Sequence, residues 1–171
     1  YYSTKGISSM FLTTPTVTAK NEYTVEQGSS VKVSWNSIAG AKSYRIYRKT
    51  STDKSWITLA DNYTDKVYYD KTAESGVKYY YTVRAKNASY MSGYTSTSLL
   101  TVLGTPILKD ALLTDAGVKV TWDAVGGATS YIVEGKKATD ADFVQLVIIG
   151  DDEAIETSYV VNNIGGVILT T

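Results

Sequence analysis

The fold of this chain is decided by a stretch that occurs twice. Residues 31–49 read VKVSWNSIAGAKSYRIYRK, and residues 118–136 read VKVTWDAVGGATSYIVEGK. In the first copy, Val31, Val33 and Trp35 alternate with polar residues, which predicts a strand buried on one face. A turn that contains glycine follows in both copies, and a second alternating stretch comes after it. The repeated stretch therefore predicts two successive strands.

The same alternation places the later strands. Tyr44 and Ile46 share one face of the second strand, and we expect that face to be core. The longest strand follows the turn at residues 74–76, with the odd-numbered residues of 79–85 directed inward. No segment of a dozen residues combines helical spacing with a helix cap. The chain is therefore predicted to be all-β, with almost no helix.

The repeat also predicts the domain organisation. The two copies are identical at nine of 19 positions, and the segments LTTP (12–15) and LGTP (103–106) repeat as well. A period near 90 residues fits one sandwich domain. We expect residues 1–14 to be the last strand of a preceding repeat and residues 15–105 to be a complete domain of seven strands. Residues 106–171 are expected to form an incomplete domain that lacks its last strands.

The pattern resembles the fibronectin type III domain. The resemblance rests on a strand-B tryptophan, a tyrosine nine residues later, and residues 76–87, GVKYYYTVRAKN. The first two are Trp35 and Tyr44 in one copy, and Trp122 and Tyr131 in the other. The family implies tandem immunoglobulin-like two-sheet β-sandwiches, with Tyr79 at the tyrosine corner. The segments KYYYTVRAKN, GVKVTW and GATSY are similar to tandem repeats in large surface proteins of Gram-positive bacteria, Firmicutes in particular.

The second copy departs from this pattern towards its end. Past a small insertion the alignment continues with Tyr159 opposite Tyr69, and Leu169 stands where Tyr79 stands in the first copy. The corner hydrogen bond should therefore be absent from the second unit. Its missing final residues should expose the edge of the strand that begins near Leu169.

Composition excludes several classes of function. The chain has no Cys and no His, which removes disulfides, thiol nucleophiles, Cys/His zinc sites and imidazole catalysis. Lys and Arg number 17 and Asp and Glu number 17, so no basic excess indicates a nucleic-acid partner. No apolar run approaches the roughly 18 to 20 residues of a membrane span. We therefore expect no nucleic acid and no membrane span in this segment.

One candidate binding face can be proposed from strand parity. If Tyr44 faces the core, Arg45 and Tyr47 lie on the outer face of the sheet, beside Tyr80 and Arg84 of the neighbouring strand. Aromatic rings with guanidinium groups can stack on a sugar or anchor a protein partner. The alternative is that these cross-strand pairs only stabilise a solvated sheet.

Acidic residues supply two further candidates, and both are weak. A cation site could use acidic residues of the second unit, but no Asp-x-Asp-x-Asp-Gly loop fixes its geometry. These residues are Asp140, Asp142, Asp151, Asp152 and Glu153. Hydrolysis by a carboxylate pair needs a desolvated acid in a cleft, and no apolar run surrounds the carboxylates of the first unit. Those are Asp61, Asp65 and Asp70. We therefore assign no catalytic residue, cofactor or metal, and expect no enzymatic activity.

Two functions remain open. The first is a structural spacer in an extracellular or cell-wall-associated bacterial surface protein, with neighbouring repeats or other copies of the chain as partners. The second is a module that binds a glycan or a host protein, as an adhesin or as an accessory domain of a secreted polysaccharide-degrading enzyme. Two explanations fit the incomplete ends. Adjacent residues of a longer polypeptide could complete both, or copies could assemble by strand complementation, with residues 1–14 of one copy inserting Ile7, Met10 and Leu12 into the open edge of the next copy's second unit.

Overall fold

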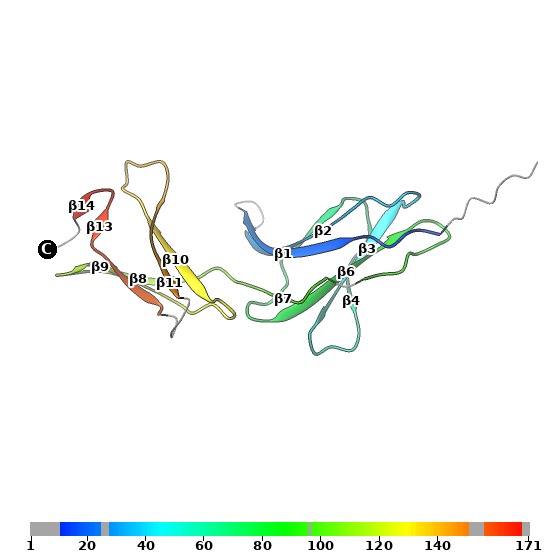
Figure 1. The fold of residues 1–171 in the computed structure, drawn as a ribbon, viewed down its shortest axis with the longest axis horizontal. Helices are drawn as coiled ribbons and strands as arrows, with labels where there is room; N and C mark the ends of the chain where they lie inside the picture. The colour runs from blue at the N-terminus through cyan, green and yellow to red at the C-terminus, as the bar shows by residue number, and fades with distance from the viewer. Residues whose placement is uncertain (1–10, 25–27, 96, 151–155, 169–171) are drawn as a thin grey trace, which may run out of the picture. The chain divides into compact units, whose positions relative to one another are not determined.

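A computed structural model of the chain shows strands and turns, with no helix in the described residues (Figure 1). The described residues are 11–24, 28–95, 97–150 and 156–168. The predicted all-β class is confirmed. No helix in these ranges is long and apolar enough to cross a membrane. The chain divides into two compact units, Tyr1–Val102 and Leu103–Thr171.

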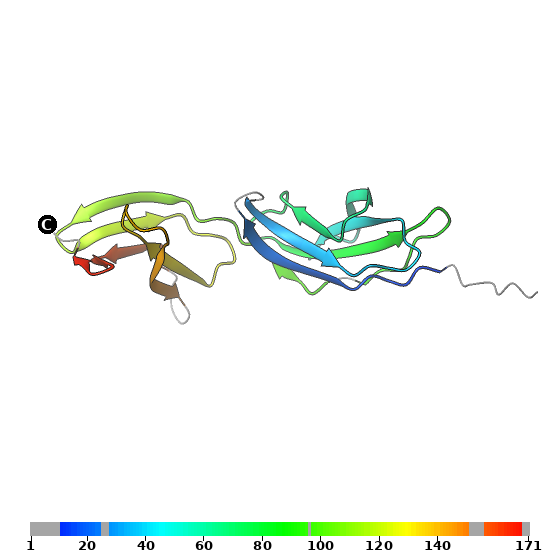
Figure 2. The ribbon, with the colours of Figure 1, turned by 90° about the horizontal axis from the view of Figure 1, so that it is seen from above.

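The first unit is a two-sheet sandwich, and seven strands lie in its described residues (Figure 2). One sheet has the order β1-β2-β5 and the other has the order β4-β3-β6-β7, with antiparallel pairing throughout. The strands are β1 (Val17–Thr24), β2 (Gly28–Trp35), β3 (Ser43–Thr50), β4 (Ile57–Tyr63), β5 (Val67–Asp70), β6 (Lys78–Lys86) and β7 (Leu100–Thr101).

The core of the first unit follows the predicted alternation. Val31 and Val33 on β2 are fully buried, as are Ile46 on β3 and Val83 on β6. Side chains of alternating parity on facing strands thus meet between the two sheets, as expected for a sandwich. The same parity directs the charged residue Arg48 inward, where it is buried.

The segment before β1 also packs on the first unit. Leu12 belongs to its buried core, and its Cδ2 lies against Gly40. The Phe11 ring lies 5.5 Å from the ring of Tyr90. Residues 11–14 contain no strand, and residues 1–10 of the predicted donor strand lie outside the described residues. Strand complementation would therefore require Leu12 to leave a core that it already helps to fill.

The second unit contains a smaller sandwich. Its described strands form a sheet of order β12-β9-β8 and the pairs β10-β11 and β13-β14. They are β8 (Leu108–Thr114), β9 (Gly117–Trp122), β10 (Ser130–Gly135), β11 (Val144–Gly150), β12 (Ser158–Val161), β13 (Asn163–Ile164) and β14 (Val167–Ile168). Trp122, Tyr131 and Val161 are its buried apolar residues within the described ranges, while Leu112 and Ile132 are exposed.

The strand register corrects the predicted alignment of the two units. Tyr159 pairs with Val120 on β9, and in the first unit the residue that pairs with the equivalent Val33 is Tyr68. Tyr159 is therefore the counterpart of Tyr68, and the prediction that it matches Tyr69 was wrong by one residue. By the same register, Val161 is the counterpart of Asp70, which pairs with Val31.

The strand whose edge was predicted to be open begins near Leu169, and residues 169–171 lie outside the described residues. In the first unit β3 pairs with β4 on one side and β6 on the other. Its counterpart β10 pairs with β11 alone among the described residues, and β14 pairs with β13 in a short hairpin. Among the described residues, β10 therefore lacks the second neighbour that β3 has in the first unit.

Candidate functional site

The predicted binding residues lie side by side on β3 and β6. In the antiparallel register Arg45 is opposite Arg84, and Lys49 is opposite Tyr80. Tyr47 is opposite Thr82. All of these positions have the parity opposite to the core residues, so they share the outer face of one sheet.

A hollow of about 100 Å³ opens on this face. Its lining residues are Tyr47, Trp56, Thr82, Arg84 and Tyr94. Trp56 precedes β4, and Tyr94 lies in the connection between β6 and β7. Their ring centroids are 5.9 Å apart at 77°, an edge-to-face contact that forms one wall. We call this set of five residues the aromatic hollow.

The turn that carries Trp56 is fixed at its start. The backbone N–H of Thr50 donates to Oδ2 of Asp53 at 3.0 Å, and the N–H of Asp53 donates to Oγ1 of Thr50 at 3.1 Å. The bond from the Thr50 N–H, followed by one from the Thr50 side chain, lowers the pKa of the Asp53 carboxyl. Beside the turn, Nζ of Lys49 lies 5.2 Å from the Trp56 ring and 5.7 Å from the Tyr80 ring. Trp56 is thus held between a capped turn and a cation.

The connection that carries Tyr94 is bonded along β6. The N–H of Thr97 donates to the carbonyl of Tyr81 at 2.8 Å, and the N–H of Tyr81 donates to Oγ1 of Thr97 at 3.0 Å. Oγ1 of Thr82 donates to the carbonyl of Thr95 at 2.7 Å. Because the connection covers it, Thr82 is fully buried, although its parity places it on the outer face.

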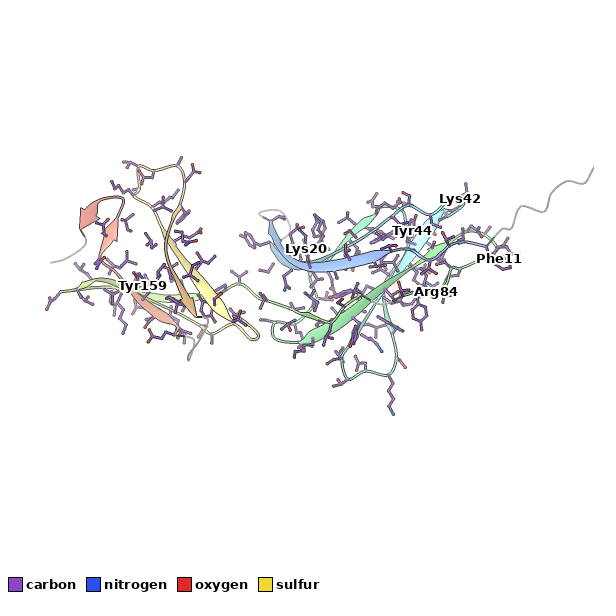
Figure 3. The ribbon with its side chains drawn as sticks, viewed as in Figure 1. Phe11, Lys20, Lys42, Tyr44, Arg84 and Tyr159 are labelled. Atoms are coloured by element: carbon purple, nitrogen blue, oxygen red, sulfur yellow. The ribbon has the colours of Figure 1, made fainter. Side chains whose placement is uncertain are left out.

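Arg84, which is labelled in Figure 3, is held in place through its Nε nitrogen. Its Nε donates to the carbonyl of the buried Ser92 at 2.7 Å, and its guanidinium carbon lies 5.8 Å from the Tyr94 ring centroid. Within the described ranges, its two Nη nitrogens have no partner. A guanidinium fixed at Nε with free Nη groups can still form two parallel bonds to a carboxylate.

Arg45 has a different environment from the other predicted residues. It pairs with Asp61 on β4, and Lys86 pairs with the same carboxylate. The hydrogen bond from Arg45, followed by that from Lys86, holds the pKa of Asp61 well below its usual range. Arg45 is therefore part of an ion-pair cluster beside the hollow, and it does not line it.

The acidic candidates form no common site. Asp70 was expected to be solvated, and that expectation was wrong, because only 1% of it is exposed. Its carboxylate accepts bonds from Arg48 and from the Tyr81 hydroxyl, and the pKa of Tyr81 is raised mainly by burial. In the second unit Asp140 and Asp142 are exposed, while Asp151, Asp152 and Glu153 lie outside the described residues. No cluster of three metal-ligating side chains occurs in the described part of the chain.

Sequence reasoning missed Trp56 and Tyr94. Strand parity finds residues on β3 and β6, but it says nothing about side chains that fold over the sheet from its connections. One signal was available for Trp56. The other two tryptophans, Trp35 and Trp122, occupy equivalent core positions in the repeat, whereas Trp56 follows the polar run STDKS.

No protein-family model and no curated protein sequence matches the chain. Among solved structures, it is similar to an Fn3-like protein from Clostridium thermocellum, with 26% identity and a TM-score of 0.44 over 53% of this chain and 92% of that one. It is also similar to the FN1–FN3 domains of chicken CNTN1, with 14% identity and a TM-score of 0.47 over 90% of this chain and 57% of that one. The chicken interferon gamma receptor alpha chain gives 16% identity and a TM-score of 0.43, over 86% and 80% of the two chains.

Proposed function

We propose that this chain is a non-enzymatic structural segment of an extracellular bacterial surface protein, in which tandem sandwiches space or present other domains. The observation that carries the proposal is an arrangement found in both units, in which a tyrosine packs against a tryptophan and its hydroxyl accepts a backbone N–H of the turn between the two residues. The Trp35 and Tyr44 rings lie 5.5 Å apart, and the Tyr44 hydroxyl accepts the N–H of Ile38 at 3.0 Å.

The second unit has the same Trp–Tyr arrangement, formed by its own residues. The Trp122 and Tyr131 rings lie 5.4 Å apart, and the Tyr131 hydroxyl accepts the N–H of Val125 at 2.7 Å. Each unit thus fixes its own turn between the second and third strands with its own side chains. Units that are stabilised independently and joined by the short segment between β7 and β8 suit an array of spacers.

Single-molecule stretching of the full chain tests the mechanical part of this proposal. A spacer should unfold in two separate steps, and the first unit should release about 300 Å of extended chain. Trp35→Ala should weaken only the step of the first unit. A single cooperative step, or extension without any step, would overturn the proposal.

Protease treatment of intact source cells tests the extracellular part. An antibody against the chain follows the protein during this treatment. We expect the protease to remove the antigen while the cells are still intact. An antigen that stays protected until lysis would place the protein inside the cell and contradict the proposed location.

The aromatic hollow favours a second candidate, a module that binds a glycan or a protein. Its Trp56 and Tyr94 rings come from separate connections, and both connections are fixed by hydrogen bonds to the sheet, which lowers the entropy lost when a ligand binds. A glycan array probed with the full chain tests this candidate. Reproducible binding that is lost in Tyr47→Ala and in Tyr80→Ala would favour it over the spacer role.

A further inference from the structure

We infer that the aromatic hollow takes a single acidic sugar ring, a pyranose that carries a carboxylate, as a residue of a polyuronic polysaccharide. The inference rests on the second candidate function above and names its ligand class. It follows from the size of the hollow, its place in the sheet, its walls and its charge.

Size limits the occupant to one small ring. The hollow has a volume of about 100 Å³. Sites for drug-sized ligands span roughly 300 to 1,000 Å³, so this one cannot enclose a larger molecule. It can seat one ring of a chain whose other residues remain in solvent.

The place of the hollow argues against a peptide strand or helix. It lies over β3, which pairs with β4 and β6, and over the part of β6 beyond its short pairing with β7. There the other edge of β6 is bonded to the connection that follows it, because the N–H groups of Ser92 and Thr97 donate to the carbonyls of Ala85 and Tyr81. An added strand would find no free backbone ladder there. A helix would need an apolar groove with anchors along several turns, which a hollow of this size does not supply.

The walls suit the C–H face of a sugar. Tyr47, Trp56 and Tyr94 present aromatic surfaces, whose π faces are electron-rich and attract weakly positive C–H groups. Tyr94 is 51% exposed, so its ring is available to a ligand. Hydroxyl and guanidinium groups on the same face can bind the ring's polar substituents.

The charge of the hollow selects an acid. Arg84 lines it with free Nη nitrogens, and no Asp or Glu is among its described lining residues. The neighbouring carboxylates are already engaged, Asp53 by its own turn and Asp61 by Arg45 and Lys86. A sugar carboxylate would therefore meet a fixed guanidinium without a competing anion.

Titration calorimetry on the full chain tests the inference, with tetragalacturonate as the probe and galactotetraose as its neutral counterpart. We expect the acidic probe alone to bind, and binding to weaken as salt is added. Arg84→Gln should weaken binding by about tenfold or more, as expected for loss of a hydrogen bond to a charged group. Tyr94→Ala should also weaken it, and this exposed side chain can be removed without opening the core.

Matched controls lie elsewhere on the first unit. Lys42→Gln removes an exposed charge, and Tyr23→Ala removes a tyrosine that is 67% exposed on the other sheet. Both should leave binding unchanged, and circular dichroism melts should show that all four variants are folded. If Lys42→Gln reduces binding as much as Arg84→Gln, the sugar is attracted only by general charge and the inference fails.

The remaining outcomes separate this inference from the functions proposed above. Equal binding of both sugars would overturn the acidic preference but leave a glycan-binding module. Binding of an acidic proline-rich peptide that depends on Tyr94, with neither sugar bound, would overturn the sugar and leave a protein-binding module. If no probe binds, the inference fails, while the glycan array decides the second candidate and the spacer proposal still stands on its own tests.

Discussion

Nη1 of Arg48 lies 2.6 Å from Oδ2 of Asp70 in the interior of the first unit. The pair joins β3 of one sheet to β5 of the other. The Tyr81 hydroxyl donates to the same oxygen at 3.0 Å, and the N–H and hydroxyl of Thr72 donate to Oδ1. Such a complete set of partners offsets part of the cost of removing the carboxylate from water.

The second unit has replaced both charges together. The counterpart of Asp70 is the buried Val161, and the counterpart of Arg48 in the repeat is Gly135. Loss of one charge alone would leave the other uncompensated in a low-dielectric interior. The paired replacement is therefore the change that physical chemistry favours.

We predict that breaking this pair on one side is costly and that removing both charges is not. Asp70→Val leaves the Arg48 guanidinium buried without a counter-charge and should destabilise the first unit by about 3–5 kcal/mol. Arg48→Met combined with Asp70→Val should cost markedly less than the sum of the two single changes. Urea denaturation of the four proteins in a double-mutant cycle measures the coupling. Additive single effects would contradict the prediction.

The tyrosines of the first unit should differ in what their hydroxyls contribute. Tyr44→Phe leaves the buried N–H of Ile38 without an acceptor, at a cost of about 1–3 kcal/mol. The Tyr79 hydroxyl is 3.4 Å from the N–H of Glu74, so the predicted corner bond is present but long. Tyr79→Phe should therefore cost less than about 1 kcal/mol. Denaturant melts in which Tyr79→Phe is the more damaging change would reverse this ranking.

Alternation predicted the inward residues because the period of a strand fixes the face of each side chain. This is why Val33, Ile46 and Val83 could be placed from the sequence, along with the outer positions of β3 and β6. The burial of Asp70 could not be predicted in this way. Its partner Arg48 is 22 residues away and on the other sheet, so no local pattern links the two.

The aromatic hollow was only half predictable for a related reason. Tyr47 and Arg84 follow from parity on paired strands, whereas Trp56 and Tyr94 come from connections with no fixed period. Their positions depend on specific bonds such as that from Thr82 to Thr95, which only the folded chain brings together.

The Asp61 ion pairs should make the first unit sensitive to acid. Its carboxyl pKa is lowered by Arg45 and Lys86 in the folded state, while the unfolded value is about 3.9. The stabilisation is therefore complete above the unfolded pKa and is lost as pH falls through it towards the folded pKa. Asp61→Asn should lose less stability than the native chain between about pH 6 and about pH 3.

Asp65→Asn is the matched control for the acid experiment, because Asp65 forms no ion pair in the described part of the chain. Its urea midpoint should follow pH as the native chain does. If Asp61→Asn shows the full acid sensitivity of the native chain, the ion pairs with Arg45 and Lys86 do not carry it.

The edge of β10 leads to a prediction of self-association. Among the described residues β10 pairs only with β11, and Ile132 on this strand is 58% exposed. An apolar groove of about 250 Å³ runs beside it, and Trp122 and Tyr131 are among its lining residues. Unpaired backbone groups beside exposed apolar surface form a template for pairing with another chain.

Sedimentation of the 171-residue chain over a range of concentrations measures this association. Ile132→Lys should reduce it several-fold, because a lysine at a strand edge must be desolvated when a second strand pairs there. Phe143→Lys, which changes an equally exposed apolar residue just before β11, should leave the association unchanged. Equal loss in the two variants would assign the association to general hydrophobicity, and a chain that stays monomeric at every concentration would show that the β10 edge is not used.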